Sequence, residues 1–182
     1  APFIQLKPEM ASYDCGTMNW MYFGVFNNNP KFLETMGLKM QEVSVKPEIE
    51  VFDVGMINDA AYYLKKGFLK APLHFQFCMG VASGIDATTE NLVFMKNTMD
   101  RVAPGSTWSA FGVGKGAMET MYAAVALGGH IRVGMEDNVF YKKGELAKSN
   151  VQFVERARRV IEEYGLEVAT SDEARLILGL KK

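Results

Sequence analysis

Short runs of β-branched and aromatic residues alternate along the chain with longer stretches of helical pattern. The short runs are typical of buried strands, and the longer stretches of amphipathic helices. The predicted strands are Met10–Cys15, Glu48–Asp53, Leu73–Met79, Trp108–Val113 and Gly129–Met135. The predicted helices lie near Lys31–Gln41, Ile57–Leu69, Thr89–Val102, Ala117–Leu127, Ser149–Tyr164 and Ser171–Leu178. This alternation, with a repeat of roughly 30 residues, predicts an α/β fold of parallel βαβ units.

Local signals mark the ends of the last two predicted helices. Ser149 and Gln152 have the spacing of a capping box, and so have Thr170 and Glu173. Gly165 stands where the longer helix should end, because glycine tolerates the left-handed conformation of a helix cap. The pattern also predicts an apolar stripe on that helix, made of Val151, Val154, Ile161 and Tyr164.

The length of 182 residues fits one domain with a sizeable core. About five β/α units are present, whereas a closed (β/α)8 TIM barrel needs eight and typically about 250 residues. An open doubly wound sheet could be complete at this length, but no glycine-rich phosphate loop follows the first strand. The chain also begins in what resembles a loop. We therefore expect residues 1–182 to form a single, incomplete TIM-barrel domain, the last five β/α units plus a C-terminal helix.

Composition excludes several other classes of protein. The formal net charge of −1 provides no basic surplus for a nucleic acid or a membrane surface. No apolar run approaches the ~20 residues of a membrane span. Cys15 and Cys78 are far apart and lack metal-ligand spacing, so we expect reduced thiols in a cytoplasmic protein.

The segment Gly129–Asn138 carries the strongest chemical signal. Alternate side chains of a strand share a face, so Arg132 and Glu136 should point together into the barrel. A buried arginine and a buried glutamate need a partner or a ligand, and a structural salt bridge is the alternative explanation. Glu136 and Asp137 form a carboxylate pair at the strand end, which suits metal ligation combined with proton transfer.

Glu48 and Glu50 form a second pair of carboxylates, and they share a face of their strand for the same reason of parity. Two carboxylates inside a barrel need a cation, and Arg132 is the expected partner. An outward, solvated face is the alternative for this pair. His74 begins its strand, near the opposite end of the barrel, and is interpreted as a structural residue.

The loops that follow the strands contain candidate binding groups. Gly112–Gly116 closes a strand and opens a helix, where backbone amides and Lys115 suit an anion, although a tight turn explains the same glycines. Phosphate commonly binds to the loops after the last two strands of a TIM barrel. Thr17 and Ser83 lie in other loops at the same end and are candidate substrate contacts.

Several segments, in chain order, resemble the β-keto acid cleavage enzymes. They are Lys7–Ser12, Gly16–Thr17, Pro47–Asp53, Gly128–Asn138, Ser149–Asn150, Ala169–Thr170 and Glu173–Arg175. The resemblance spans nearly the whole chain, its sequence GGHIRVGMEDN is specific, and it is greatest to members that act in lysine fermentation. It implies a homotetrameric TIM barrel with an active-site Zn²⁺. Such an enzyme condenses a β-keto acid with acetyl-CoA and gives acetoacetate and a new acyl-CoA.

The resemblance also implies roles for residues of this chain. Glu136 is the expected zinc ligand, Asp137 the general base, and Arg132 the group that orients the base. Glu50 or Glu48 is expected to join the network of Arg132. Around them we expect substrate contacts from Thr17 and Ser83, and, from the anion-site argument alone, CoA phosphates near Gly114 and Lys115.

One feature of the family is absent from the sequence. The remaining zinc ligands of the family come from a His-x-His pair, but neither His74 nor His130 has a histidine two residues away. We therefore expect a chain that lacks roughly three β/α units and is inactive alone. The alternatives are another metal-dependent TIM-barrel lyase or aldolase, and a non-catalytic barrel fragment that needs an N-terminal partner.

Overall fold

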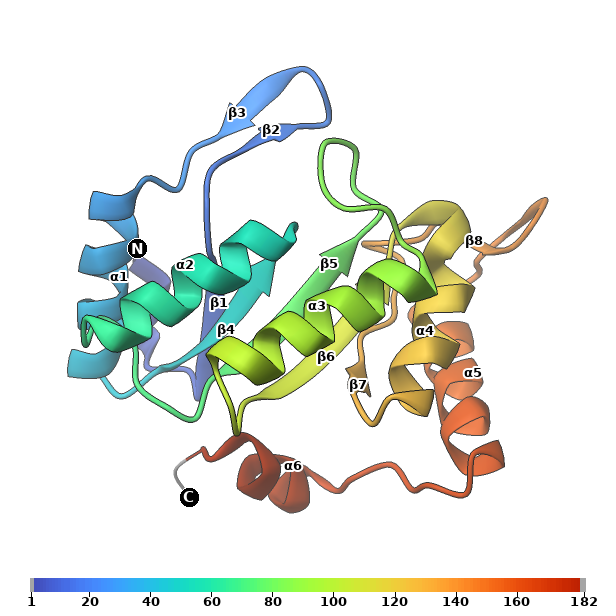
Figure 1. Ribbon diagram of the computed structural model, residues 1–182. Helices are drawn as coiled ribbons and strands as arrows, with labels where there is room; N and C mark the ends of the chain where they lie inside the picture. The colour runs from blue at the N-terminus through green and yellow to red at the C-terminus, as the bar shows by residue number, and fades with distance from the viewer. Residues whose placement is uncertain (1, 181–182) are drawn as a thin grey trace.

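The computed structural model describes residues 2–180, and its central feature is a sheet of five parallel strands (Figure 1). Each strand lies beside the next one along the chain: β1 (Met10–Asp14), β4 (Lys46–Val51), β5 (His74–Met79), β6 (Thr107–Gly112) and β7 (His130–Ile131). The helices between them are α1 (Pro30–Glu42), α2 (Val54–Lys65), α3 (Thr89–Val102) and α4 (Ala117–Ala126). The α/β class and the parallel sheet are thus as predicted.

The elements outside this pattern are shorter. Two antiparallel hairpins were not predicted: β2 (Met18–Trp20) with β3 (Gly24–Phe26), and β8 (Phe140–Lys142) with β9 (Glu145–Leu146). Short 3-10 turns occur at η1 (Pro2–Leu6) and η2 (Gly114–Gly116), and two helices end the chain, α5 (Asn150–Glu163) and α6 (Ser171–Leu178). None of the described helices is long and apolar enough to cross a membrane.

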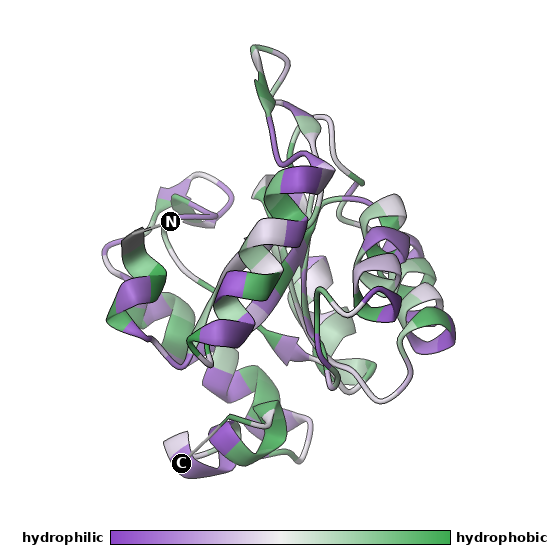
Figure 2. Cartoon of the chain, turned by 90° about the vertical axis from the view of Figure 1, so that its left-hand side faces the viewer, coloured by the Kyte–Doolittle hydropathy of each residue, from purple (hydrophilic) through white to green (hydrophobic). Residues whose placement is uncertain are grey.

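One face of the sheet is apolar and packs against the helices. Residues at alternate positions of each strand enter the core together with buried residues of α1 to α4. At the centre of this face, Phe77 of β5 is fully buried and stacks on Trp108 of β6, with ring centroids 5.4 Å apart. In Figure 2 the helices carry both hydrophilic and hydrophobic residues, as expected for elements that cover a sheet on one side only.

The other face of the sheet is polar. The register places one residue from each strand in a continuous row, which we call the polar row: Asp14, Glu50, Gln76, Ser109 and His130. A second row behind it holds Ser12, Glu48, His74 and Thr107. Glu48 and Glu50 therefore do point away from the helix layer, as predicted.

The last two helices show where local signals succeed and fail. Thr170 and Glu173 form the predicted capping box at α6, and Gly165 has the positive φ of 77° expected at the end of α5. The capping box predicted at α5 is wrong, because Gln152 accepts from the amide of Lys148 and the side chain of Ser149 makes no capping bond.

The predicted stripe on α5 is right at Ile161, which packs against a buried cluster of α4 and α5, and wrong at its other three residues. Val151, Val154 and Tyr164 are more than half exposed, whereas the buried residues are Phe153, Ala157 and Val160. The buried face is rotated from the predicted stripe by roughly one residue position around the helix, since both sets recur with helical spacing. Phe153 completes a small cluster with the hairpin, where its ring meets that of Tyr141.

Candidate active site

The loops at the carboxyl end of the sheet bring the candidate residues to one side of the molecule. Each of the five strands is followed, within a few residues of its end, by one candidate residue: Thr17, Asp53, Gly80, Gly114 and Glu136. Because the strands are parallel, these positions share an edge, which is where barrel enzymes place their active sites.

The segment that carries the carboxylate pair is a turn, and this corrects the predicted strand Gly129–Met135. β7 ends at Ile131, one further backbone bond joins Arg132 to Ala110, and the amide of Asn138 then donates to the carbonyl of Gly134. Because Glu136 lies beyond the strand, the alternation of side chains along a strand does not determine where its side chain points. Its side chain is 85% exposed, while that of Asp137 is 7% exposed.

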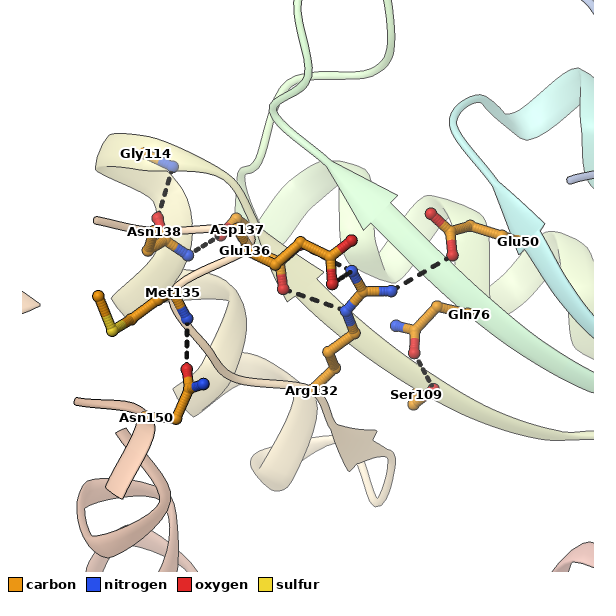
Figure 3. A network of polar contacts seen from close by, with 11 residues as sticks. Glu50, Gln76, Ser109, Gly114, Arg132, Met135, Glu136, Asp137, Asn138 and Asn150 are labelled. Atoms are coloured by element: carbon orange, nitrogen blue, oxygen red, sulfur yellow. Dashed lines mark hydrogen bonds and ion pairs between the residues drawn. The ribbon is translucent and has the colours of Figure 1, made fainter. Parts of the chain in front are cut away.

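Arg132 is the centre of the site (Figure 3). Its Nε and Nη2 donate to the two carboxylate oxygens of Asp137 at 3.1 and 2.9 Å. Nη1 lies 3.4 Å from Oε2 of Glu50, and Nη2 lies 3.4 Å from Oε2 of Glu136. A bidentate pair of this kind fixes the orientation of both groups as well as their charge. The predicted partnership of Arg132 with Asp137 and Glu50 is thus present in the structure.

The guanidinium of Arg132 also packs over the face of an aromatic ring. Its Cζ lies 4.2 Å from the ring centroid of Phe111, a buried residue of β6. A cation over an aromatic face is attracted by the ring quadrupole, and the ring restricts the plane of the guanidinium. Phe111 is a site residue that the sequence reasoning missed.

Several carboxylates lie around Arg132, and burial is the main reason that their pKa values are raised. Burial, followed by the charge of Asp14, raises the pKa of Glu50 to about 7, against the lowering effect of Arg132. Burial is also the first cause of the raised pKa of Asp14, Glu48 and Asp137. At neutral pH the cluster can therefore both hold and release protons, as acid–base chemistry requires.

Two asparagines fix the turn that carries Glu136 and Asp137. Oδ1 of Asn138 accepts from the amide of Gly114 at 2.7 Å, and its Nδ2 donates to the carbonyl of Gly112 at 2.9 Å. Oδ1 of Asn150, in the first turn of α5, accepts from the amide of Met135 at 2.7 Å. Neither role was predicted, although Asn138 and Asn150 both belong to segments that had been singled out.

The same bond corrects one expectation for the anion site. The amide of Gly114 is engaged by Asn138 and does not face a ligand. Lys115 remains exposed beside a cavity of about 870 Å³, which also reaches Arg132 and Asp137. The amide of Gly114 is therefore not available to a phosphate, whereas the side chain of Lys115 is exposed.

Thr17 and Ser83 lie together, but away from Arg132, in a second cavity of about 370 Å³. The hydroxyl of Thr17 accepts from the amide of Asn28 at 2.9 Å, so it closes the loop of the β2–β3 hairpin. Ser83 has a positive φ of 75°, and its buried hydroxyl has no partner in the described part of the chain. The structure thus brings these two together without joining them to the network of Arg132.

The second row of the polar face is structural in character. His74 is buried, and its ring nitrogens contact the hydroxyls of Thr107 at 2.9 Å and Ser109 at 3.3 Å. Burial, followed by the charge of His130, lowers its pKa to about 4, so it is neutral at physiological pH. This agrees with its interpretation as a structural residue. Glu48 stands beside it and makes no ion pair with Arg132 among the described residues.

The described residues do not by themselves fit a metal ion. Over residues 2–180, no three histidine, cysteine, aspartate or glutamate side chains lie together as a metal site. In the carboxylate cluster the central position is already occupied by the guanidinium of Arg132. We therefore assign no chemical step to a metal.

Comparison with known proteins identifies relatives of this chain. The family model described as beta-keto acid cleavage enzyme matches residues 1–180. The chain belongs to this family. A 3-keto-5-aminohexanoate cleavage enzyme of Fusobacterium nucleatum is 48% identical over 98% of the chain, and one of Acetoanaerobium sticklandii is 44% identical over 98%. The 3-oxoadipate:acetyl-CoA acetyltransferase of Cupriavidus necator is 38% identical over 97%.

The chain is shorter than these members of the beta-keto acid cleavage enzyme family. It spans 64% of the length of the first two relatives and 62% of the third. Its fold matches that of ObcA, with a TM-score of 0.83 for the apo structure and 0.84 for the complex with oxaloacetate. These matches cover 95% and 96% of this chain but 44% and 46% of ObcA, at 20% and 19% identity, and so support the fold alone.

Proposed function

We propose that the chain is the C-terminal part of a zinc-dependent β-keto acid cleavage enzyme that condenses a β-keto acid with acetyl-CoA. The products are acetoacetate and a new acyl-CoA. Two relatives bear the name of an enzyme that cleaves 3-keto-5-aminohexanoate, and this compound is our first candidate for the keto acid. The names of other relatives combine a β-keto acid with acetyl-CoA as well.

The observation that carries this proposal is the bidentate pair of Arg132 and Asp137 at the carboxyl end of the sheet. Asp137 is a buried carboxylate whose pKa is raised by burial, held in a fixed orientation by a permanent cation. A base with a raised pKa and a fixed geometry is suited to remove a proton from carbon beside a carbonyl group. Arg132 is placed to stabilise the negative charge that then develops on oxygen.

The reaction balances with these groups. Asp137 takes a proton from C2 of the keto acid, and the resulting carbanion attacks the thioester carbon of acetyl-CoA and displaces the CoA thiolate. The thiolate then attacks the original keto carbon, the bond between that carbon and C2 breaks, and acetoacetate leaves after C2 regains the proton from Asp137. Glu50, with a pKa of about 7, can exchange protons with its surroundings through the same network.

The zinc requirement stays a prediction. When zinc is bound it supplies Lewis-acid polarisation of the keto oxygen. Glu136, an exposed carboxylate that follows β7 and has a 3.4 Å contact to Arg132, is our candidate ligand from this chain. The other ligands, the closure of the sheet into a (β/α)8 barrel, the tetramer and a cytoplasmic location are likewise proposals that follow from family membership.

The experiment is a complementation assay. The chain is assayed alone, and after co-expression with the part of the Fusobacterium nucleatum relative that lies outside the 178 aligned residues. We expect acetoacetate to form only in the second preparation, and only when acetyl-CoA and 3-keto-5-aminohexanoate are both present. The matched control is the same preparation with Asp137→Asn, which should assemble and fail to turn over.

The alternatives give different results in this assay. A lyase or aldolase would release acetoacetate from the keto acid without acetyl-CoA. A non-catalytic fragment would assemble with the N-terminal part and form no product with any combination of substrates. Either outcome would remove the proposed reaction.

A further inference from the structure

The larger cavity is bounded by four segments of the chain, and we call it the hairpin cavity. Its wall is formed by the end of β6 with the start of α4, by the turn Arg132–Asn138, by the β8–β9 hairpin, and by α5. A volume of about 870 Å³ is within the range of sites that bind cofactors and other large ligands.

The lining of the hairpin cavity combines three kinds of side chain. Arg132 and Asp137, in the site described above, are among the lining residues. Apolar side chains also line it, from α4, from α5 and from the β8–β9 hairpin with the residue before it: Met118, Met121, Val139, Phe140 and Phe153. The exposed lysines Lys115, Lys142 and Lys143 complete the lining. A ligand that fills this space needs a reacting end, an apolar or flexible middle, and anionic groups.

The positive groups of the cavity are not all neutralised within the chain. Lys142 pairs with Glu145 at 3.0 Å, and the guanidinium of Arg156 lies 3.5 Å from the ring centroid of Tyr141. Lys115 and Lys143, in contrast, have no ion pair among the described residues. Two lysines without an ion pair among the described residues, both lining one cavity, are suitable contacts for phosphate groups.

We propose that the hairpin cavity holds the acyl-CoA co-substrate, an inference that rests on the proposed function. The thioester lies against Arg132 and Asp137, the pantetheine arm lies along Met118 and the other apolar residues, and the phosphates lie against Lys143 and Lys115. The β8–β9 hairpin is then a binding element for the CoA moiety.

The test is direct binding to the 182-residue chain, measured by calorimetry with CoA, pantetheine and ADP as separate probes. Lys143→Glu should raise the Kd of CoA about tenfold, because it replaces an attraction to phosphate by a repulsion, and it should leave pantetheine unaffected. Met118→Trp fills the cavity from a partly exposed position and should weaken CoA and pantetheine together. Lys148→Glu is the matched control, since Lys148 does not line the cavity, and it should bind CoA like the wild type.

The outcomes separate this inference from the proposed reaction. Absence of CoA binding by the chain, equal loss in Lys143→Glu and Lys148→Glu, or binding of ADP as tight as that of CoA would each overturn it. In the complemented preparation, an unchanged KM for acetyl-CoA in both Lys143→Glu and Met118→Trp would overturn it while the reaction stands. CoA binding that depends on Lys143 and Met118, without acetoacetate formation, would support the cavity assignment and remove the reaction.

Discussion

The two faces of the five-stranded sheet are made from alternate residues of the same strands, yet they differ in almost every physical respect. Phe77 on one face is fully buried among aromatic rings. Its neighbour Gln76, on the other face, is almost as buried, but its Nε2 has no partner among the described residues. Burial of apolar area stabilises the first face. Burial of carboxylates and amides destabilises the second, as the raised pKa of Glu50 shows.

The comparison shows where stability and chemistry are divided in this molecule. The helix-covered face supplies the free energy that holds the strands together. The polar face and the turn after β7 offset part of this free energy, because they bury Asp14, Glu50 and Asp137 near a single guanidinium. If that division is correct, substitutions on the two faces should affect different measurements.

The largest expected effect concerns the adjacent carboxylates Glu136 and Asp137 in the complemented enzyme. Asp137→Asn should keep bound zinc and lower kcat by about 10²–10⁴, as is typical when a general base is removed. Glu136→Gln should lose zinc and activity together, because a neutral amide is a poor zinc ligand. Elemental analysis and steady-state kinetics test both. Loss of zinc from Asp137→Asn, or kcat near the wild-type value, would contradict the assigned roles.

A second prediction compares neighbours on one strand. Phe77→Ala should lower the free energy of unfolding by about 3–5 kcal/mol, because a large ring leaves a cavity in the helix-covered core. Gln76→Leu should change it by less than about 1 kcal/mol, since the lost bond to Ser109 is offset by removal of an unpaired buried amide. Urea unfolding of the purified chain measures both. Equal losses would mean that the two faces do not divide stability as described.

A third prediction uses pH. The pKa of Glu50 is about 7 in the folded chain and near its usual 4.5 in the unfolded chain, so the folded state binds the proton more tightly. The stability linked to Glu50 is therefore fully present below pH 4.5 and is lost as the pH rises through about 7. Between pH 5 and pH 8 the wild type should lose about 2 kcal/mol more than Glu50→Gln.

The control for this pH effect is Glu42→Gln, at an exposed position of α1. Its unfolding free energy should follow the wild-type pH dependence over the same range. A wild type and a Glu50→Gln variant with parallel pH profiles would show that Glu50 is not buried against like charge.

The smallest expected effect concerns the turn that carries the carboxylates. Asn138→Ala removes the bonds to Gly114 and Gly112, and should lower the free energy of unfolding by about 1 kcal/mol. It should lower kcat about tenfold with an unchanged KM for the keto acid, because Asp137 is then less well oriented. The conservative variant Asn138→Asp keeps the acceptor for Gly114 and should recover part of kcat. A fall in stability without any fall in kcat would make Asn138 a structural residue only.

The sequence predicted the fold well wherever periodicity was strong. α3 and α6 have the predicted bounds, and four of the strands differ from prediction by at most two residues at either end. The hairpins were missed for different reasons. The turn of β2–β3 lacks glycine and has positive φ at Met21 and Tyr22, whereas the Lys143–Gly144 pair of β8–β9 was an available turn signal.

The site was predicted in part. Residue types at the strand ends led to Arg132, Asp137 and Glu50, because charged groups on a core-facing strand need partners. Side-chain bonds across the fold, such as those of Asn138 and Asn150, depend on register and on the turn after β7, and no local pattern encodes them. The strand assigned to Gly129–Met135 failed because that turn takes over after Ile131.

The polar row also bears on how this family can change over time. Asp14, Glu50 and Asp137 all interact with one guanidinium, so the effect of replacing any one of them depends on which residues stand at the other positions. Asp14→Asn alone should relieve part of the repulsion on Glu50, and the second relief from Glu50→Gln should then be smaller. Substitutions in such a group are epistatic. Among related chains, we therefore expect the residues at these acidic positions to change together while the arginine at position 132 stays the same.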